Sequence, residues 1–251
     1  MKIILNGAYG RMGRHIAEIA ETLPDIEVTA GIDKSTSSHP ITFPVYKDPF
    51  QITETGDVII DFSHPSAIPG LVEYAKVKRL PMVIATTGLS EHELDIITEA
   101  SAHIPILRAA NMSLGICLMH ELVKRMTEVL GGTFDIEIIE QHHNQKSDSP
   151  SGTALALADS INSVLRKPGQ LVYGRHGADS RREKDEIGIH AVRGGTVPGI
   201  HTVIFAGCDE ILEITHTAQS RKVFALGAIH AARYITGKPP GMYDMKDVLQ
   251  I

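Results

Sequence analysis

One segment of the chain gathers the residue types that acid–base chemistry requires. Residues 140–154 read EQHHNQKSDSPSGTA. His142 and His143 titrate near neutral pH, which suits proton transfer. Lys146 adds a full positive charge close by in the sequence. Together these residues favour a site at which a small anionic substrate undergoes a proton-coupled reaction.

The same segment ends where a helix is predicted to begin, running to about residue 165. Ser151, Gly152 and Thr153 occupy its first positions. A helix start leaves backbone N–H groups without intrahelical partners and carries the positive end of the helix dipole. The sequence therefore predicts an anion-binding site next to the two histidines and the lysine.

A metal site is the alternative interpretation of this segment. Glu140, His142 and His143 are all metal-ligating types. Adjacent histidines on an extended segment point in opposite directions, which argues against binding of one ion by both. We therefore expect no bound metal.

A glycine-rich turn near the N-terminus indicates a second kind of site. Gly7-Ala8-Tyr9-Gly10-Arg11-Met12-Gly13 lies between the first predicted strand and the first predicted helix, where a dinucleotide pyrophosphate binds. Gly10 lets the backbone approach the phosphates, and Gly13 lets the helix pack closely on the strand. The turn departs from the common G-x-G-x-x-G pattern, since Ala8 occupies the first glycine position.

An acidic residue follows at the expected distance. Asp33 ends the second predicted strand, 20 residues after Gly13, where an acid accepts hydrogen bonds from the adenosine ribose. A turn-capping role for Asp33 is the alternative. Lys34 comes next, so a 2′-phosphate would meet one repelling and one attracting charge. The pattern predicts a nicotinamide dinucleotide site for NADH or NADPH.

The segments around the turn alternate between strand and helix. Pro65 and the capping-box spacing of Ser90 with Glu93 indicate two helix starts. Residues 34–42 are predicted to be a loop. Apolar runs predict strands at 2–6, 26–32, 58–62, 82–86 and 104–109. Strands separated by helices predict a mostly parallel, doubly wound sheet.

The pattern changes after Asn111. A helix is predicted from about 115 to 130, and 134–138 alternate between apolar and polar residues. Further strands at 187–192, 202–206 and 211–215 follow one another without an intervening helix, which predicts a mixed or antiparallel sheet. The charged run 181–186 is interpreted as a solvated loop without function. A helix returns at 221–235, so two domains fit best.

Composition excludes several classes of protein. The chain has 251 residues, 43% hydrophobic and 22% charged, as in a globular protein. With 24 basic and 30 acidic residues the net charge is −6, and no basic stripe indicates nucleic-acid binding. No segment approaches the roughly 18 apolar residues of a membrane span. Cys117 and Cys208 lack metal-ligand spacing or a disulfide framework, and the apolar stretch at the N-terminus is too short for a signal peptide. We expect a cytoplasmic protein.

Residues 140–154 resemble the E-x-H-H-x-x-K-x-D-x-P-S-G-T-A signature of the 4-hydroxy-tetrahydrodipicolinate reductase family, also called dihydrodipicolinate reductase. The resemblance covers the whole chain. Its other parts, in order, are Arg11-Met12-Gly13, Thr86-Thr87-Gly88, Ala109-Ala110-Asn111-Met112-Ser113, Ile214-Thr215-His216 and Ser220-Arg221.

The resemblance implies an NAD(P)H-dependent reduction in the diaminopimelate route to lysine. The substrate would be 4-hydroxy-tetrahydrodipicolinate, a cyclic dicarboxylate that loses water and is reduced. By this resemblance His142 would donate or accept a proton, and Lys146 would donate one. His143, Gly152 and Thr153 would contact a substrate carboxylate.

The resemblance also assigns the cofactor and the domains. The turn from Gly7 to Met12, with Asp33 and Lys34, would hold the adenosine half. The nicotinamide half would lie along Ala85, Thr86, Thr87, Ala109, Ala110, Asn111 and Met112. The family usually has glycine where Ala85 stands, and because backbone groups make that contact we expect only a small adjustment. The implied fold is a Rossmann-like domain of residues 1–113 and 221–251, with residues 114–220 binding substrate and forming a homotetramer.

Two other hypotheses remain open from the residues alone. One is another nicotinamide-linked dehydrogenase, of the semialdehyde or homoserine kind, but the former needs a cysteine nucleophile and neither cysteine lies in a polar loop. The other is a regulator that senses NAD(H) without chemistry, which would leave the cluster at 140–154 without a purpose. Turnover of the cyclic substrate separates these hypotheses.

Overall fold

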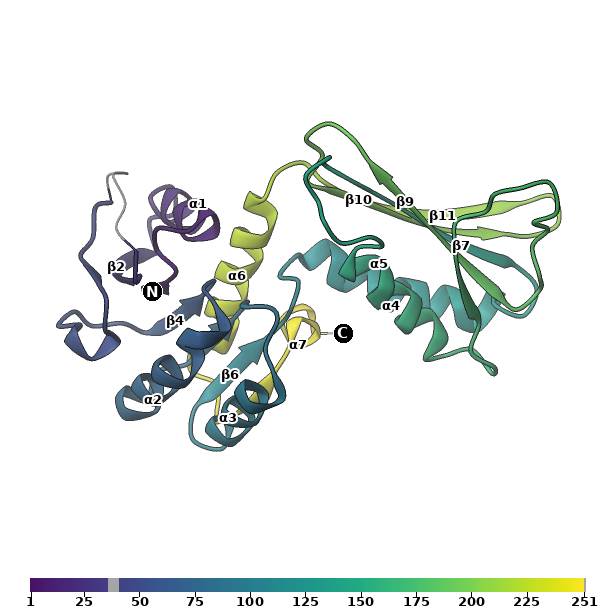
Figure 1. Ribbon diagram of the computed structural model, residues 1–251. Helices are drawn as coiled ribbons and strands as arrows, with labels where there is room; N and C mark the ends of the chain where they lie inside the picture. Colours follow the sequence, from purple (N-terminus) through teal and green to yellow (C-terminus); the bar gives the residue numbers. More distant parts are fainter. Residues whose placement is uncertain (36–40, 251) are drawn as a thin grey trace. The chain divides into compact units, whose positions relative to one another are not determined.

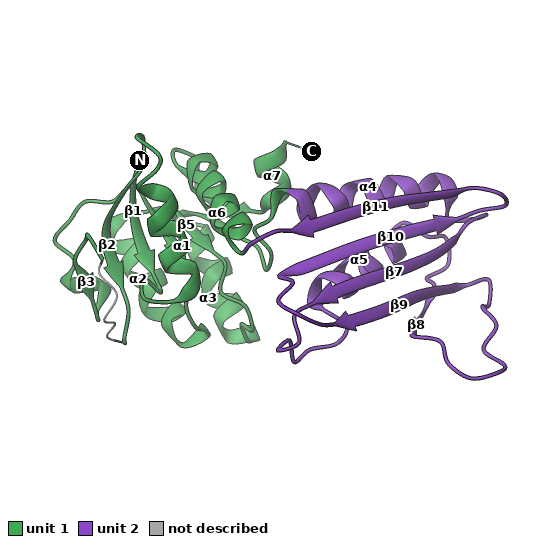
Figure 2. Ribbon diagram, turned by 90° about the horizontal axis from the view of Figure 1, so that it is seen from above, with its two compact units in different colours: residues 1–114, 221–251 green, residues 115–220 purple. Residues whose placement is uncertain are grey.

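The computed structural model describes residues 1–35 and 41–250 (Figure 1). The chain divides into two compact units, one of residues 1–114 with 221–251 and one of residues 115–220 (Figure 2). Each unit has its own sheet and is described by itself. Most of the predicted loop at 34–42 falls on residues 36–40, outside the described residues.

The first unit contains a seven-stranded sheet in the order β12-β6-β5-β4-β1-β2-β3. All of its hydrogen-bonded strand pairs are parallel, so the predicted doubly wound sheet is confirmed. The strands are β1 (Lys2–Asn6), β2 (Glu27–Ile32), β3 (Val45–Tyr46), β4 (Val58–Asp61), β5 (Met82–Ile84), β6 (Pro105–Arg108) and β12 (Gly241–Tyr243).

Helices cover both faces of this sheet. The strand order runs from β1 to β2 in one direction and from β4 to β5 in the other, so right-handed crossovers place α1 and α2 on opposite faces. Helix α1 packs against α6, and α2 packs against α3. The helices are α1 (Arg11–Ala20), α2 (Ile68–Lys78), α3 (Glu91–Ser101), α6 (Lys222–Ile235) and α7 (Met245–Leu249).

Several local features of the first unit differ from the sequence prediction. Strands β3 and β12 were not predicted, because two or three edge residues are too few to show a periodic pattern. Two short 3₁₀ helices, η1 (Pro49–Gln51) and η2 (Pro65–Ala67), were also missed. Pro65 opens η2, which runs into α2, since its fixed φ suits the first turn of either helix type. Ser90 does cap α3, with its backbone N–H donating to Glu93 over 2.7 Å.

The second unit contains a five-stranded mixed sheet in the order β11-β10-β7-β9-β8. β10 is antiparallel to β11 and β7, whereas β7, β9 and β8 are parallel, as the prediction of a mixed sheet requires. Strand β8 was not predicted. The strands are β7 (Asp135–His142), β8 (Gln170–Tyr173), β9 (Glu186–Arg193), β10 (Gly199–Ala206) and β11 (Ile211–Ala218).

Two helices, α4 (Leu114–Leu130) and α5 (Gly152–Asn162), cover one face of the second sheet (Figure 1). Their apolar residues pack with Ile136 and Ile138 of β7. Helix α5 ends at Asn162, earlier than predicted, and the Asn162 side chain accepts a hydrogen bond from the Gly169 backbone over 2.8 Å. None of the helices in the described part of the chain is long and apolar enough to cross a membrane.

Alternation along β7 gives the strand two different faces. Ile136, Ile138, Glu140 and His142 are buried under the helices, while the residues between them are half-buried on the other face. Glu140 therefore lies on the face opposite to Glu137. The alternation therefore places the Glu140 carboxylate under the helices and the Glu137 carboxylate on the opposite, half-buried face.

The charged run at 181–186 is not the free solvated loop that the sequence suggested. The Arg182 guanidinium donates to Glu137 over 3.1 Å and to Asp135 over 2.8 Å. It also donates to the backbone carbonyl of Glu186. A planar guanidinium with five donors can join several acceptors at once, so this residue ties its loop to β7.

Candidate active site

The glycine turn of the first unit is shaped by backbone contacts. Gly7 has φ +80°, and a Cβ there would lie 2.3 Å from the Phe62 carbonyl oxygen. A Cβ on Gly13 would lie 2.2 Å from the Gly7 carbonyl oxygen. Gly10 caps α1 in extended conformation, without a side-chain cap. The turn thus leaves the start of α1 open for an anion, as a dinucleotide pyrophosphate requires.

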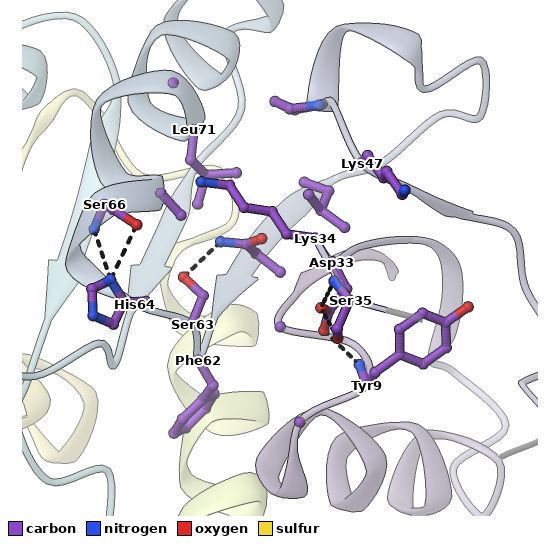
Figure 3. Close-up of a pocket in the computed structure, with 17 residues that line it drawn as sticks. Tyr9, Asp33, Lys34, Ser35, Lys47, Phe62, Ser63, His64, Ser66 and Leu71 are labelled. Carbon is purple, nitrogen blue, oxygen red and sulfur yellow. Dashed lines mark hydrogen bonds between the residues drawn. The ribbon is translucent and has the colours of Figure 1, made fainter. Parts of the chain in front are cut away.

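A cleft of about 490 Å³ opens beside this turn (Figure 3). Of the predicted cofactor residues, it is lined by Gly7, Tyr9, Gly10, Asp33 and Lys34. Ala8 is not among them, because its side chain is buried in the core.

The carboxylate of Asp33 already holds the turn in shape. Its Oδ2 accepts from the Tyr9 backbone N–H over 2.9 Å, and its Oδ1 accepts from the Ser35 backbone N–H over 2.9 Å (Figure 3). The turn-capping role is therefore present in the structure. Because a carboxylate has about four lone-pair sites, the same group retains capacity for a ribose hydroxyl.

Other residues of the cleft were not predicted as site residues. Phe62, Ser63, His64 and Ser66 follow β4, the neighbour of β1 in the sheet. The apolar run at 58–62 could have signalled them, since ligands of parallel sheets bind beyond the carboxyl ends of central strands. Lys47 also lines the cleft, but it follows the unpredicted β3.

A second cleft of the first unit, of about 310 Å³, brings together most of the predicted nicotinamide-side residues. Arg221 and Phe224, at the start of α6, join them from a distant part of the chain. Phe62 lines both clefts. The predicted residues in this cleft are Arg11, Met12, Ala85, Thr87, Ala110, Asn111 and Met112.

Thr86 and Ala109 lie beside the second cleft rather than on its lining. The Ala109 backbone N–H donates to the Ile84 carbonyl over 3.2 Å. Thr86 is buried, and its hydroxyl donates to Asp61 over 2.7 Å while accepting from the Ser63 backbone N–H over 2.9 Å. Thr86 therefore supports the loops around the cleft.

Asp61 joins three of these loops from a fully buried position. Besides Thr86, its carboxylate accepts from Asn6 Nδ2 over 2.7 Å and from Ser63 Oγ over 2.6 Å. Burial raises the pKa of Asp61, although the hydrogen bonds from Ser63, Thr86 and Asn6 act in the opposite direction. All of these donors are neutral.

The second unit holds the residues of the 140–154 segment. His142 is 8% exposed, and its Nδ1 lies 2.6 Å from Glu140 Oε2. Glu140 is fully buried and also accepts from the Ser151 backbone N–H over 3.0 Å. Two nitrogens of Arg193 donate to its two oxygens, each over 2.7 Å. Burial would raise the pKa of Glu140, but the hydrogen bonds from Arg193 and His142 hold it below its ordinary value.

A second histidine packs against the first. The rings of His142 and His201 meet edge to face, with centroids 5.1 Å apart. Nε2 of His201 lies 2.9 Å from Ser151 Oγ, which caps α5 by accepting from the Ala154 backbone N–H. Burial, followed by the nearby charge of His142, lowers the pKa of His201 to about 4. His201 is therefore neutral at physiological pH.

Lys146 lies in the loop between β7 and α5. Its Nζ donates to both oxygens of Asp148, over 2.7 and 2.8 Å. The hydrogen bond from Lys146 lowers the pKa of the Asp148 carboxyl. The His143 backbone N–H donates to the Val197 carbonyl over 2.8 Å, which holds this loop against the one that follows β9.

Gly152 and Thr153 form the first turn of α5, after the Ser151 cap. A Cβ added at Gly152 would meet nothing within 4 Å. Local packing therefore does not require a glycine at this position, unlike at Gly7 and Gly13.

The sequence did not identify all partners of this cluster. Arg193 of β9 and His201 of β10 were not predicted, whereas Ser151 was expected only at the helix start and Asp148 was part of the signature without a role. Within the described ranges, no group of three or more His, Cys, Asp or Glu residues could hold a metal ion. Glu140 and His142 bind each other instead.

The glycine turn on a parallel sheet and the buried histidine–carboxylate pair define a class, the two-domain nicotinamide-dependent oxidoreductases. Comparison with known proteins gives the family. Residues 1–112 match the N-terminal region of dihydrodipicolinate reductase, and residues 115–249 match its C-terminal region. The chain belongs to the dihydrodipicolinate reductase family, as the sequence signature predicted, and is an oxidoreductase dependent on a nicotinamide cofactor.

Individual relatives agree along the whole chain. The 4-hydroxy-tetrahydrodipicolinate reductase of Caldanaerobacter subterraneus subsp. tengcongensis is 52% identical, with 100% of this chain and 98% of the relative covered. That of Clostridium tetani is 49% identical over 99% of this chain and 97% of the relative.

Solved structures share the fold. A dipicolinate-bound dihydrodipicolinate reductase from Paenisporosarcina sp. TG-14 has a TM-score of 0.82 at 22% identity, with 98% of each chain covered. A probable dehydrogenase from Thermotoga maritima has a TM-score of 0.62 at 11% identity, covering 100% of this chain and 93% of the other. The latter likeness shows that the fold also serves other dehydrogenases.

Proposed function

We propose that the chain reduces 4-hydroxy-tetrahydrodipicolinate to tetrahydrodipicolinate with loss of water, and that His142 and Lys146 are its catalytic residues. The activity is that of its family and belongs to the diaminopimelate route of lysine biosynthesis. The observation that carries the assignment is the buried His142, whose Nδ1 is bound by Glu140. Nε2 is then the ring nitrogen left to exchange a proton with substrate.

The start of α5 would bind the substrate's carboxylates. Backbone N–H groups at Gly152 and Thr153 and the helix dipole favour an anion there. The open space at Gly152 supports this role, because glycine leaves room for close approach of a ligand. His143 and Lys146 would supply further contacts to the substrate.

Lys146 would supply the second proton. Its Nζ is held by both oxygens of Asp148, which positions the side chain beside the loop's own backbone. A protonated amine at this position can both attract the dicarboxylate and donate a proton to it.

The first unit would bind NADH or NADPH. The bound nicotinamide supplies the hydride for the reduction. The cleft lined by Gly7, Tyr9, Gly10, Asp33 and Lys34 would take the adenosine half. The cleft with Arg11, Met12, Ala85, Asn111 and Met112 would take the nicotinamide half. Asp33 favours a free ribose hydroxyl, while Lys34 and Lys47 line the same cleft and can offset a 2′-phosphate. We therefore expect both cofactors to be used.

The remaining assignments concern the whole protein. Residues 1–113 with 221–251 would form the cofactor domain, and 114–220 the domain for substrate and assembly.

The face of the second sheet away from α4 and α5 carries Ile139, Thr202 and Ile204, all half-buried, which supports association of copies into a homotetramer. The chain has only two cysteines, too few for a disulfide framework, and with its nicotinamide cofactor this fits a cytoplasmic enzyme.

Cofactor oxidation tests this proposal directly. Absorbance at the nicotinamide band is followed with freshly generated cyclic substrate and with either NADH or NADPH. We expect oxidation only when the dicarboxylate is present. If a sample that binds NADH oxidises neither cofactor, the reductase assignment is wrong.

A further inference from the structure

We propose that Glu140 and Arg193 are positioning residues that fix the orientation and charge of His142 and couple it to the substrate-binding start of α5. The inference rests on the proposed function of His142. It concerns a connection between the segment that links β7 to α5 and Arg193 of β9, which lies 53 positions from Glu140.

Glu140 is placed to select which nitrogen of His142 is free. Its Oε2 lies 2.6 Å from Nδ1, so Nδ1 carries the proton and donates it to the carboxylate. Nε2 faces Gly199, where a Cβ would lie 2.9 Å from that nitrogen. The glycine therefore preserves space beside the nitrogen that exchanges the proton.

Arg193 keeps the buried carboxylate ionised. The guanidinium makes a two-point contact with Glu140, with both distances 2.7 Å. It also donates to the Asp148 backbone carbonyl over 2.7 Å, so it holds the loop that carries Lys146. A fully buried carboxylate would otherwise tend to protonate and lose its charge. One arginine thus serves both proposed catalytic residues.

The same carboxylate fixes the start of α5. Oε1 of Glu140 accepts from the Ser151 backbone N–H, and Ser151 Oγ in turn binds His201. His201 packs on His142, which closes a ring of contacts around the active histidine. Because His201 stays neutral, it packs against His142 without placing a second positive charge beside it.

The surroundings of this ring contain few other charges. Besides Arg193, the ionisable groups that act on these residues are His216 of β11 and, from the loop, Lys146 and Asp148. Both His201 and His216 have pKa values lowered by burial. Asp148 is paired with Lys146, whereas Glu140 is the carboxylate in direct contact with the His142 ring.

The chain offers a matched control on the other face of β7. Glu137 Oε2 lies 2.7 Å from His190 Nε2, and Glu137 Oε1 accepts from Arg175 and Arg182. This carboxylate has the same partner types as Glu140, but it lies away from α5 and is 20% exposed. A general effect of losing a carboxylate–histidine–arginine contact appears at both positions, whereas a catalytic effect appears only at Glu140.

The experiment compares Glu140→Gln with Glu137→Gln in the full-length protein. The parent enzyme is assayed first, so a failure of the proposed function is recognised before the variants are compared. kcat, the KM for substrate and the KM for NADH are then measured from pH 5 to 10, and size-exclusion chromatography checks the assembly of each variant.

We expect Glu140→Gln to lower kcat by about 10- to 100-fold, the effect of losing one charged hydrogen bond, without changing the KM for NADH. The alkaline limb of its kcat profile should move to lower pH, since the group that contacts the imidazole Nδ1 over 2.6 Å in the parent is then a neutral amide. Glu137→Gln should keep both the parent kcat and the parent profile. A Glu140→Gln enzyme with parent kcat and an unchanged profile would overturn the proposal, as would equal losses in both variants.

Arg193→Lys provides a second test if Glu140→Gln does not fold. Lysine keeps the charge but cannot reproduce the two-point contact, so kcat should fall at least about fivefold with the KM for NADH unchanged. In ¹⁵N-histidine NMR spectra, the parent should show a protonated, hydrogen-bonded Nδ1 for His142. Parent kcat in a folded Arg193→Lys variant, or an unprotonated Nδ1 in the parent at neutral pH, contradicts the proposal.

Discussion

Each unit of this protein buries one carboxylate near the carboxyl end of a central strand, and the two carboxylates differ in their partners. Asp61 accepts hydrogen bonds from Asn6, Ser63 and Thr86, which are all neutral. Glu140 is bound by Arg193 and lies against His142. Burial prevails at Asp61 and raises its pKa, whereas charged partners prevail at Glu140 and lower its pKa.

Each unit also has a glycine beside its buried acid, and the two glycines differ in the space around them. Gly7 has a positive φ and no room for a Cβ, so its shape is imposed by packing. Gly152 has open space around it. In the proposed function, the first unit would bind its cofactor through a backbone shape that Asp61 helps to hold. The second unit would add side-chain charge to the backbone N–H groups of α5, because the proposed proton transfer needs titratable groups.

The largest expected effect tests the proposed proton transfer by the second unit. His142→Gln should lower kcat by about 10²- to 10⁴-fold, as removal of a general acid–base group does, with NADH affinity nearly intact. His190→Gln is the control, since His190 makes the equivalent contact with Glu137. Steady-state kinetics with cofactor titration checks both. Retention of most of kcat by His142→Gln would show that the histidine is not the proton-transfer residue.

The next effect concerns the charge pair itself. Arg193→Met should lower the free energy of unfolding by about 3–5 kcal/mol, because it leaves a buried carboxylate without its cation. Adding Glu140→Gln to the same chain should restore much of that stability, since no buried charge then remains. Urea unfolding of the single and double variants measures this coupling. Equal stability of the two variants would show that Glu140 does not depend on Arg193 for its charge.

The pH dependence of stability should have opposite signs at the two acids. The raised pKa of Asp61 means that folding favours its protonated form, so its contribution is present at low pH and is lost as pH rises through the folded pKa. The lowered pKa of Glu140 gives a contribution that is present above its unfolded pKa and lost as pH falls through the folded value.

Two variants that each replace one acid by its neutral amide show how the free energy of unfolding depends on pH. Relative to the parent, Asp61→Asn should gain stability as pH rises from about 4 to 7, whereas Glu140→Gln should lose stability as pH rises towards about 4.5, the ordinary pKa of a glutamate. Each unit of pKa shift corresponds to about 1.4 kcal/mol. Unfolding free energies measured at several pH values check the signs, and slopes of the same sign would refute the contrast between the two acids.

The smallest effect separates the two glycines. Gly152→Ala should fold and gain about 0.4–1 kcal/mol from reduced chain entropy, while the KM for the dicarboxylate rises about tenfold. The KM for NADH should not change. Gly7→Ala should destabilise the protein instead, because its Cβ meets the Phe62 carbonyl. Thermal unfolding and substrate titration distinguish these outcomes; an unchanged KM in Gly152→Ala would remove the start of α5 from the substrate site.

Some properties of this protein follow from its sequence alone. Long apolar runs interrupted by helical periodicity predicted the parallel sheet, since burial on both faces needs continuous apolar strands. Lys2–Asn6 is a strand at the predicted residues. The turn at Gly7–Gly13 and the signature at 140–154 were recognisable because their residues are neighbours in the chain. Short edge strands such as β3 and β8 were missed because a few residues carry no measurable period.

Only the tertiary structure decided which residues complete each site. Arg193 lies 53 positions from Glu140, and His201 lies 50 positions from Ser151. No local pattern reveals such contacts, because they depend on the pairing of β7 with β9 and β10. The structure also decided that Asp61 and Glu140 have opposite pKa shifts. An acidic residue is the same chemical group in any sequence, and its charge in the folded chain depends on burial and on the donors that packing brings to it.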